Sequence, residues 1–235
     1  MNNALKELYE KHWERLSEGL AEVNENLEDG EQASNPLLIQ LPDEQAYKSA
    51  DIRMIVFGQE TNNWHHQFQT NIGKTLDWYA SFLEARTHNG KGTFWNSARR
   101  FKGQLEEESN SKTVELVWNN VFKVGKTKRG KPGEEIRHVE KQDFDVIQQE
   151  IDILKPNLVV FFSGPYYDKH LGSRILGYEV QPVLDGYPGR EVEFWKLNGG
   201  IQAVRTYHPT YLRRSKQEGE IFNYIIDLLP DELLR

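Results

Sequence analysis

The segment FDVIQQEIDILKPNLVVFFSG, residues 144–164, decides the class of fold. Its first half has apolar residues at the spacing of one helical face, which are Phe144, Ile147, Ile151 and Leu154. Pro156 then ends the predicted helix. Residues 158–162 form a continuous run of Leu, Val and Phe, which is typical of a strand buried on both faces. A helix followed directly by such a strand predicts an α/β protein with a largely parallel sheet.

Similar units lie on both sides of this segment. The run Met-Ile-Val-Phe at 54–57 stops at Gly58 and predicts the first core strand. Further helices are expected at 5–23, 74–85, 94–105 and 221–229, and further strands at 115–118, 178–184, 192–197 and 201–206. Residues 25–36 are polar and turn-rich, so we expect an exposed connection there.

The pattern predicts one three-layer α/β/α domain with a central, largely parallel sheet over residues 1–235. It divides into an N-terminal helix and connection at 1–35, a core with the motifs at 50–216 and a C-terminal helix at 217–235. The 235 residues, of which 37% are hydrophobic, are enough for one sizeable core.

Composition restricts the classes of function. The chain has no cysteine, which excludes disulfides, thiolate zinc sites and cysteine-ligated iron-sulfur clusters, and we expect neither a metal nor a cofactor. The formal net charge of -7 means that any contact with nucleic acid needs a local basic face. There is no apolar run of ~20 residues, and acidic residues interrupt the amino terminus, so we expect a cytoplasmic protein without membrane contact.

Two polar segments follow predicted strands. Residues 55–64 contain Gly58, Gln59 and Glu60, and residues 205–214 contain His208. Because the carboxyl ends of parallel strands meet at one edge of a sheet, we expect these side chains to converge. The alternative interpretations are a polar loop that caps a helix and a hydrogen-bonded loop histidine.

The order of these segments resembles the uracil-DNA glycosylase superfamily. Gly58-Gln59-Glu60 and His208-Pro209-Thr210 are similar to its two signature loops. Residues 117–123 resemble its central strand, which ends in Asn followed three residues later by Lys. Residues 155–164 resemble its later Lys-Pro strand, and 92–95 a Phe-Trp segment of the mismatch-specific branch. The resemblance covers roughly residues 52–216 and is moderately specific as an ordered set.

The resemblance implies an enzyme that flips a damaged base out of DNA and cuts its N-glycosidic bond. Glu60 would position or activate water, and His208 would stabilise charge on the departing base. Gly58, Gln59 and Asn120 would bind the base, and Asn120 would read its edge. Phe94 or Trp95 would stack on the base, although Trp64 is also placed to do so.

DNA contacts are implied as well. Leu212 would wedge into the vacated base stack, and Arg213 and Arg214 would hold phosphates. Lys123 would contact the DNA backbone from a basic, glycine-containing segment at 123–131, for which a solvated turn is an equally good interpretation. Single-stranded and double-stranded DNA both remain possible partners.

Differences from the family pattern leave two other functions open. Glu60 is one methylene longer than the family's Asp, and Thr61-Asn62-Asn63 replaces the usual Pro-Tyr-His. These differences and the acidic net charge favour a non-catalytic protein that binds a nucleobase or nucleic acid. A hydrolase of small nucleosides or phosphoesters on a similar sheet is a third possibility.

Overall fold

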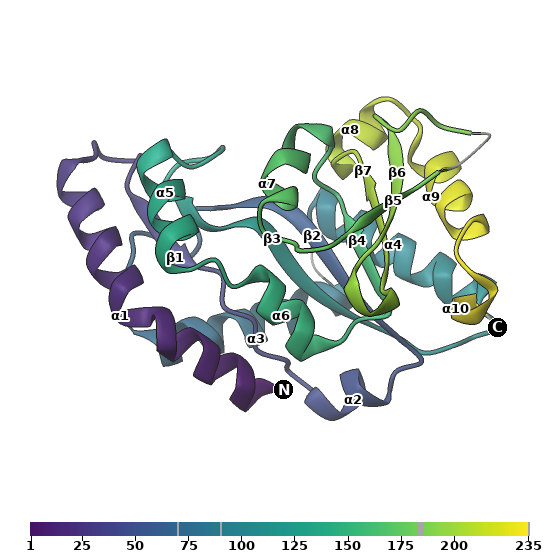
Figure 1. Cartoon of the computed structure of the whole chain (residues 1–235), viewed down its shortest axis with the longest axis horizontal. Coiled ribbons are helices and arrows are strands. Elements are labelled where there is room, and N and C mark those ends of the chain that lie inside the picture. Colours follow the sequence, from purple (N-terminus) through teal and green to yellow (C-terminus); the bar gives the residue numbers. More distant parts are fainter. Residues whose placement is uncertain (70, 90, 183–185, 235) are drawn as a thin grey trace.

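A seven-stranded sheet with the strand order β1-β3-β2-β4-β7-β6-β5 forms the centre of the molecule (Figure 1). This computed structural model describes residues 1–69, 71–89, 91–182 and 186–234. Its four central strands are parallel: β3 (Val114–Lys126), β2 (Ile52–Asn62), β4 (Leu158–Phe161) and β7 (Gln202–Thr206). The outer strands are antiparallel to their neighbours: β1 (Ala33–Pro36), β6 (Val192–Lys196) and β5 (Glu179–Gln181). The predicted α/β class with a mostly parallel sheet is confirmed.

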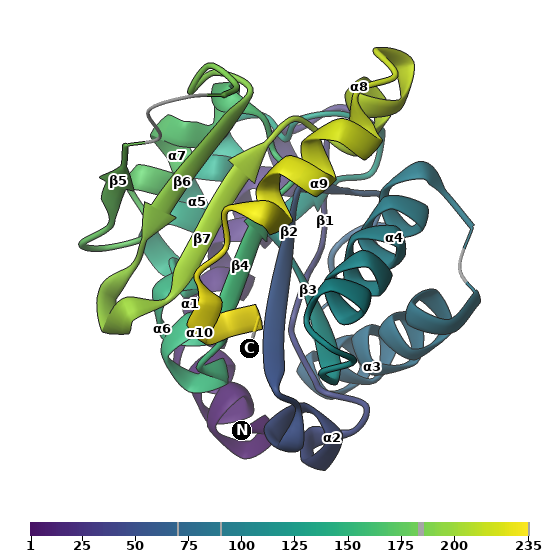
Figure 2. The ribbon, with the colours of Figure 1, turned by 90° about the vertical axis from the view of Figure 1, so that its right-hand side faces the viewer.

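Helices cover both faces of the sheet (Figure 2). One face carries α3 (Ile72–Asn89), α4 (Thr93–Glu108), α8 (Pro209–Arg214), α9 (Glu218–Asp227) and α10 (Asp231–Leu234). The other carries α1 (Asn2–Asn26), α5 (Glu134–Asp143), α6 (Ile147–Leu154) and α7 (Asp168–Gly172). The short helix α2 (Glu44–Ser49) precedes β2, and η1 (Pro165–Tyr167) and η2 (Asn198–Gly200) are single 3₁₀ turns.

The two apolar runs that predicted buried strands are the middle of the core. Residues 54–57 in β2 and residues 158–162 in and after β4 are fully buried. Phe57 lies opposite Phe161 in the parallel register, and their ring centroids are 4.8 Å apart. Helices on both faces leave neither side of these strands to water, which explains why the runs contain no alternating polar residues.

Residues 33–36 differ from the prediction of an exposed connection. They form β1, a buried edge strand that pairs with β3. The side chain of Asn35 donates to the carbonyl oxygen of His65 at 2.9 Å and accepts from the amide of Gln69 at 2.9 Å. A polar strand of this kind resembles a loop in sequence because its partners lie about thirty residues away, as the separations of 30 and 34 residues show.

Several element ends also differ from the predictions. Strand β2 continues past Gly58 to Asn62, and β3 continues past Trp118 to Lys126. The helix predicted from residue 144 begins at Ile147, after the unpredicted helix α5. The predicted strand 178–184 is found as β5, and its last two positions lie outside the described residues.

The N-terminal helix α1 packs on this same domain. Its residues Leu5, Tyr9, Leu16 and Leu20 are fully buried. The Tyr9 ring lies 5.9 Å from that of Phe144, and the Tyr9 hydroxyl donates to Glu150 in α6. Within the described ranges, none of the helices combines the length and apolar character needed to cross a membrane.

Candidate functional site

A cavity of about 480 Å³ opens where β2 and β3 approach their carboxyl ends. Its volume is in the range of small-molecule sites, ~300–1,000 Å³. Its lining residues are Gly58, Gln59, Glu60, Thr61, Asn62, Asn63, Trp64, His65, Phe82, Arg86, Phe94, Trp95, Trp118, Asn120 and His208. Every residue predicted for catalysis or base binding is in this set, so the structure brings together positions up to 150 residues apart in sequence, from Gly58 to His208.

The strand register fixes two of these residues relative to each other. Gly58 in β2 lies opposite Asn120 in β3, and Glu60 lies opposite Phe122. A Cβ atom at Gly58 would be 2.4 Å from Asn120 Oδ1, closer than two such atoms can approach. Glycine is therefore required at position 58 by the close approach of the Asn120 side chain.

Asn120 presents a buried hydrogen-bond donor at the cavity. The residue is 1% exposed, and its Oδ1 accepts from Trp118 Nε1 at 3.2 Å. Within the described part of the chain, its Nδ2 has no hydrogen-bond partner. An unpaired buried amide is costly, typically ~1–3 kcal/mol, so its retention at a cavity is expected where a ligand supplies the acceptor.

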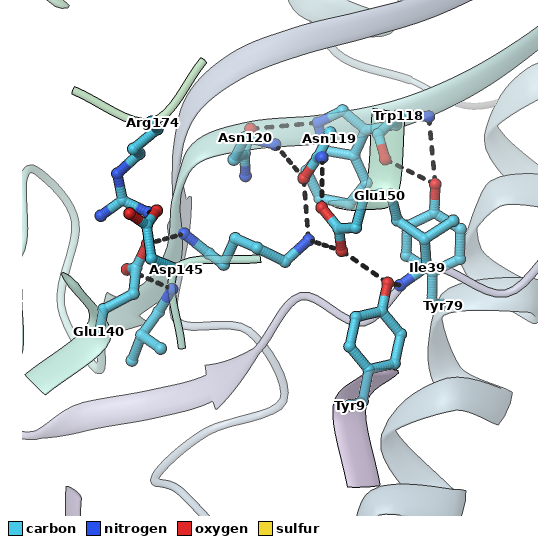
Figure 3. A network of polar contacts seen from close by, with 12 residues as sticks. Tyr9, Ile39, Tyr79, Trp118, Asn119, Asn120, Glu140, Asp145, Glu150 and Arg174 are labelled. Atoms are coloured by element: carbon cyan, nitrogen blue, oxygen red, sulfur yellow. Dashed lines mark hydrogen bonds and ion pairs between the residues drawn. The ribbon is translucent and has the colours of Figure 1, made fainter. Parts of the chain in front are cut away.

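A buried polar network holds the backbone of Asn120 (Figure 3). The Asn120 amide donates to Asn119 Oδ1 at 2.9 Å, and Lys123 Nζ donates to the same oxygen at 3.0 Å. Asn119 Nδ2 donates to Glu150 Oε2 at 2.8 Å, while Lys123 and Glu150 form an ion pair at 2.6 Å. Glu150 belongs to α6, and it accepts a hydrogen bond from Tyr9 of α1. Two helices on the opposite face of the sheet therefore help to position this part of β3.

Glu60 carries the only carboxylate among the residues that line this cavity. Its Oε2 accepts from the hydroxyl of Tyr167 at 2.6 Å, which orients the side chain. Burial raises the pKa of Glu60, against the opposing effects of the Tyr167 hydrogen bond and of Lys131 and Lys126. Burial and the same hydrogen bond raise the pKa of Tyr167, so the tyrosine keeps its proton and remains the donor.

His208 is the N-cap of α8, with a defined tautomer. Its Nδ1 accepts from the backbone amide of Thr210 at 3.2 Å, so the proton of the neutral ring is on Nε2. Burial lowers the pKa of His208, which favours this neutral form. The ring therefore offers a neutral N–H donor at the cavity near physiological pH.

Aromatic side chains form the remaining wall. The half-buried Phe94 ring lies 6.1 Å from the His208 ring at an interplanar angle of 29°. Trp95 and Trp118 meet edge to face at 5.4 Å, and Trp64 contacts Trp118 in the same manner at 5.5 Å. Such a wall suits a flat, partly polar ligand.

Two more buried polar atoms belong to the cavity wall. Trp64 Nε1 and Thr61 Oγ1 have no hydrogen-bond partner among the residues that the structure describes. These two atoms and Asn120 Nδ2 all belong to residues that line the cavity, and Thr61 Oγ1 lies next to Gly125 of β3. Gln59 is different, because its Nε2 already donates to the carbonyl oxygen of Ser163 at 2.7 Å.

The DNA contacts predicted for Lys123 and Leu212 are wrong for this structure. Lys123 is fully buried in β3 and paired with Glu150, because the strand continues through the segment expected as a loop. Leu212 is also fully buried, since helix α8 turns it onto the core. Arg213 and Arg214 are exposed, and Arg213 is paired with Glu218 at 2.9 Å, while their contacts with phosphates stay a prediction.

Four residues of the site were not predicted from the sequence: Tyr167, Phe82, Trp118 and Arg86. Tyr167 follows β4 by a few residues, so its place after a parallel strand was a usable signal. Phe82 and Arg86 are one turn apart in α3, and the Arg86 guanidinium lies 4.8 Å from the Phe82 ring centroid. Nothing in their local sequence distinguishes these two residues from an ordinary helix surface.

No protein-family model and no curated protein matches this chain, so its function has to be argued from the geometry above. In the ranges that the structure describes, no group of three or more His, Asp or Glu side chains is placed to hold a metal ion. What the cavity itself offers is one carboxylate, one neutral imidazole donor, unpaired buried polar atoms and an aromatic wall.

Proposed function

We propose that this chain is a DNA base glycosylase of the uracil-DNA glycosylase type, which hydrolyses the N-glycosidic bond of uracil or another damaged base. The observation that carries the proposal is the buried, unpartnered Nδ2 of Asn120 in a cavity shared with Glu60 and His208. A planar base with carbonyl oxygens is the ligand chemistry that this donor and the aromatic wall would accept together.

Recognition would use the two sides of the cavity. Asn120 Nδ2 would donate to a carbonyl oxygen on the edge of the base, while the Phe94 ring would stack on its face. Gly58 leaves the space that Asn120 needs. Uracil, hypoxanthine and thymine all carry such a carbonyl group, so these contacts select a class of bases.

Bond cleavage would use Glu60 and His208. A water oxygen attacks C1′ of the sugar, the C1′–N bond breaks, and its electron pair leaves with the base. Glu60 accepts a proton from the water, and the N–H of His208 donates a hydrogen bond to the base as negative charge develops on it. The products are an abasic site and the free base, which takes up a proton from solvent.

A second candidate is a protein that binds the base without cutting it. The Tyr167 hydroxyl already occupies Glu60 Oε2, which leaves only the other carboxylate oxygen to accept a hydrogen bond from water without competition. The net charge of -7 also opposes contact with long polyanions. These observations favour binding over catalysis, and the same experiment separates the two.

The test is incubation of the purified protein with oligonucleotides that contain uracil, hypoxanthine or mismatched thymine, followed by alkaline cleavage at abasic sites. We expect strand cleavage that falls by about 100-fold or more in Glu60→Gln, since general-base groups contribute ~10²–10⁴-fold. The variant keeps the size of the side chain, and its melting temperature should match that of the wild type. No abasic product from any substrate would contradict the glycosylase, and release of base from free nucleosides alone would indicate a small-nucleoside hydrolase.

A further inference from the structure

Two tyrosines that follow the carboxyl ends of β4 and β7 are exposed. Tyr166 is 77% exposed and Tyr211 is 41% exposed, and every other aromatic residue in the described ranges is at least partly buried. A large ring that is exposed to water is less favourable than the same ring buried in the core, because burial removes its apolar area from water. Two exposed rings at one end of the sheet therefore suggest a surface on which something stacks.

Arginines connect these rings into one continuous surface. Arg190 Nη2 donates to the Tyr166 hydroxyl at 2.8 Å, and its guanidinium lies 5.3 Å from the Tyr166 ring centroid. Tyr207 and Tyr211 have ring centroids 4.4 Å apart, and Arg214 lies 5.8 Å from the Tyr211 ring. Tyr207 and Tyr166 both act on the Arg190 guanidinium and raise its pKa. These five residues are called the tyrosine–arginine surface below.

The positive charge of this surface is available. In the part of the chain that the structure describes, neither Arg190 nor Arg214 forms an ion pair with a carboxylate. This contrasts with Arg205, which is buried and paired with Asp168 at 3.0 Å. A chain with a net charge of -7 thus keeps two unpaired arginines next to exposed rings.

The surface adjoins the chain segment that carries His208. Tyr207 directly precedes His208 in the cavity wall, and Gly164 lies against Tyr207, since a Cβ at Gly164 would be 3.5 Å from Tyr207 Cδ1. The Gly164 amide donates to the carbonyl oxygen of Thr206 at 2.9 Å. The turn that carries Tyr166 is thereby tied to the strand end that carries His208.

We propose that the tyrosine–arginine surface binds single-stranded nucleic acid, with unpaired bases stacked on Tyr166 and Tyr211 and phosphates held by Arg190 and Arg214. The inference rests on the proposed function, because it assigns the strand that presents the base to the cavity. Alternating rings and cations are the usual means of binding single strands, since every base has a face that can stack. In a duplex the neighbouring base pairs already cover those faces, so the exposed rings would gain little from it.

The experiment measures fluorescence anisotropy of a fluorescein-labelled strand of about 12 nucleotides without damaged bases, within the site sizes of ~4–16 typical of such proteins. The same strand annealed to its complement is the duplex probe. We expect the single strand to bind more tightly than the duplex, and Tyr211→Ala to weaken its binding by about 5- to 150-fold, the loss of one stacked base. Arg214→Ala should make the slope of log affinity against log salt concentration less steep, by roughly the amount expected for one lost phosphate contact.

Matched variants make the result specific. Tyr211→Phe keeps the ring and should bind within about twofold of the wild type, as should Leu176→Ala, which removes a side chain that is 65% exposed outside this surface. Equal binding by Tyr211→Ala, or a preference for the duplex, overturns the inference. If Tyr211→Ala excises uracil from single strands as well as the wild type does, the glycosylase proposal is supported and this surface is not needed for it. If the strand binds and Tyr211→Ala weakens that binding, but no base is excised, the surface is supported and the glycosylase is contradicted.

Discussion

In the proposed reaction, Glu60 must lose its own proton before it can take one from water, and its neighbours affect that step in opposite directions. Burial raises its pKa above the ordinary value of 4.5. The hydrogen bond from Tyr167 and the charges of Lys131 and Lys126 lower it. Since burial has the largest effect, the carboxylate form is complete only at a higher pH than for an exposed glutamate.

This balance predicts the acid side of the pH profile. A raised pKa keeps Glu60 protonated to higher pH, so kcat/KM for base release should rise with pH through a midpoint above 4.5. Tyr167→Phe removes a hydrogen bond that stabilises the carboxylate, and the midpoint should move to still higher pH. Pre-steady-state rates across pH 4–8 would measure it, a range chosen around the value of 4.5. Tyr47→Phe is the control, because the Tyr47 hydroxyl has no hydrogen-bond partner among the described residues. An unmoved midpoint in Tyr167→Phe would rule out a positioning role.

Gly58 provides a second test at the residue scale. Gly58→Ala places a Cβ 2.4 Å from Asn120 Oδ1, so the amide must shift. A displacement of about 1 Å at a reacting centre can cost ~100-fold, and we expect kcat/KM or base affinity to fall by about that factor. Gly103→Ala is the matched control, because a Cβ there meets no atom within 4 Å. If Gly58→Ala retains wild-type kinetics, the amide does not read the ligand.

At the scale of elements, the sequence predicted the middles of the core strands well and their ends poorly. Apolar runs identify a strand only where both faces meet helices, as in residues 54–57 of β2. Beyond Trp118, β3 carries Asn119, Asn120 and Lys123, which resemble a loop. They are buried in a strand because Glu150 and Asn119 satisfy the lysine, and such long-range partners leave no local pattern.

The Lys123–Glu150 pair predicts how strongly this strand end depends on α6. Both side chains are fully buried, so Glu150→Gln leaves an uncompensated ammonium and should lower the free energy of unfolding by about 3–5 kcal/mol. Urea denaturation followed by tryptophan fluorescence would measure the loss. Glu10→Gln, in the exposed pair with Lys6, should change stability by less than about 1 kcal/mol. Similar effects in the two variants would show that the buried pair does not stabilise β3.

For the whole molecule, the net charge does not show how the basic residues are distributed over the surface. The value of -7 averages over surfaces of different character, including the paired Arg213 and the unpaired Arg190 and Arg214. The loops expected to meet at the carboxyl edge of the sheet do meet there, because parallel strands impose it. Which basic residues face water could not be predicted, since helix α8 and the end of β3 decide that through packing.

The shared ladder of β2 and β3 also limits how this site can change. Glu60 and Asn120 lie on neighbouring strands, two positions out of register, with Gly58 opposite Asn120 and Glu60 opposite Phe122. Two residues along the strands and one strand spacing across them therefore separate the two backbones, about 8 Å in all, and neither can shift without slipping the sheet. The distance between the two backbones is therefore fixed, and only the lengths and conformations of the two side chains can change the distance between their polar groups. In the proposed enzyme, the length of the Glu60 side chain would set its distance from the ligand, because the strand holds its backbone in place.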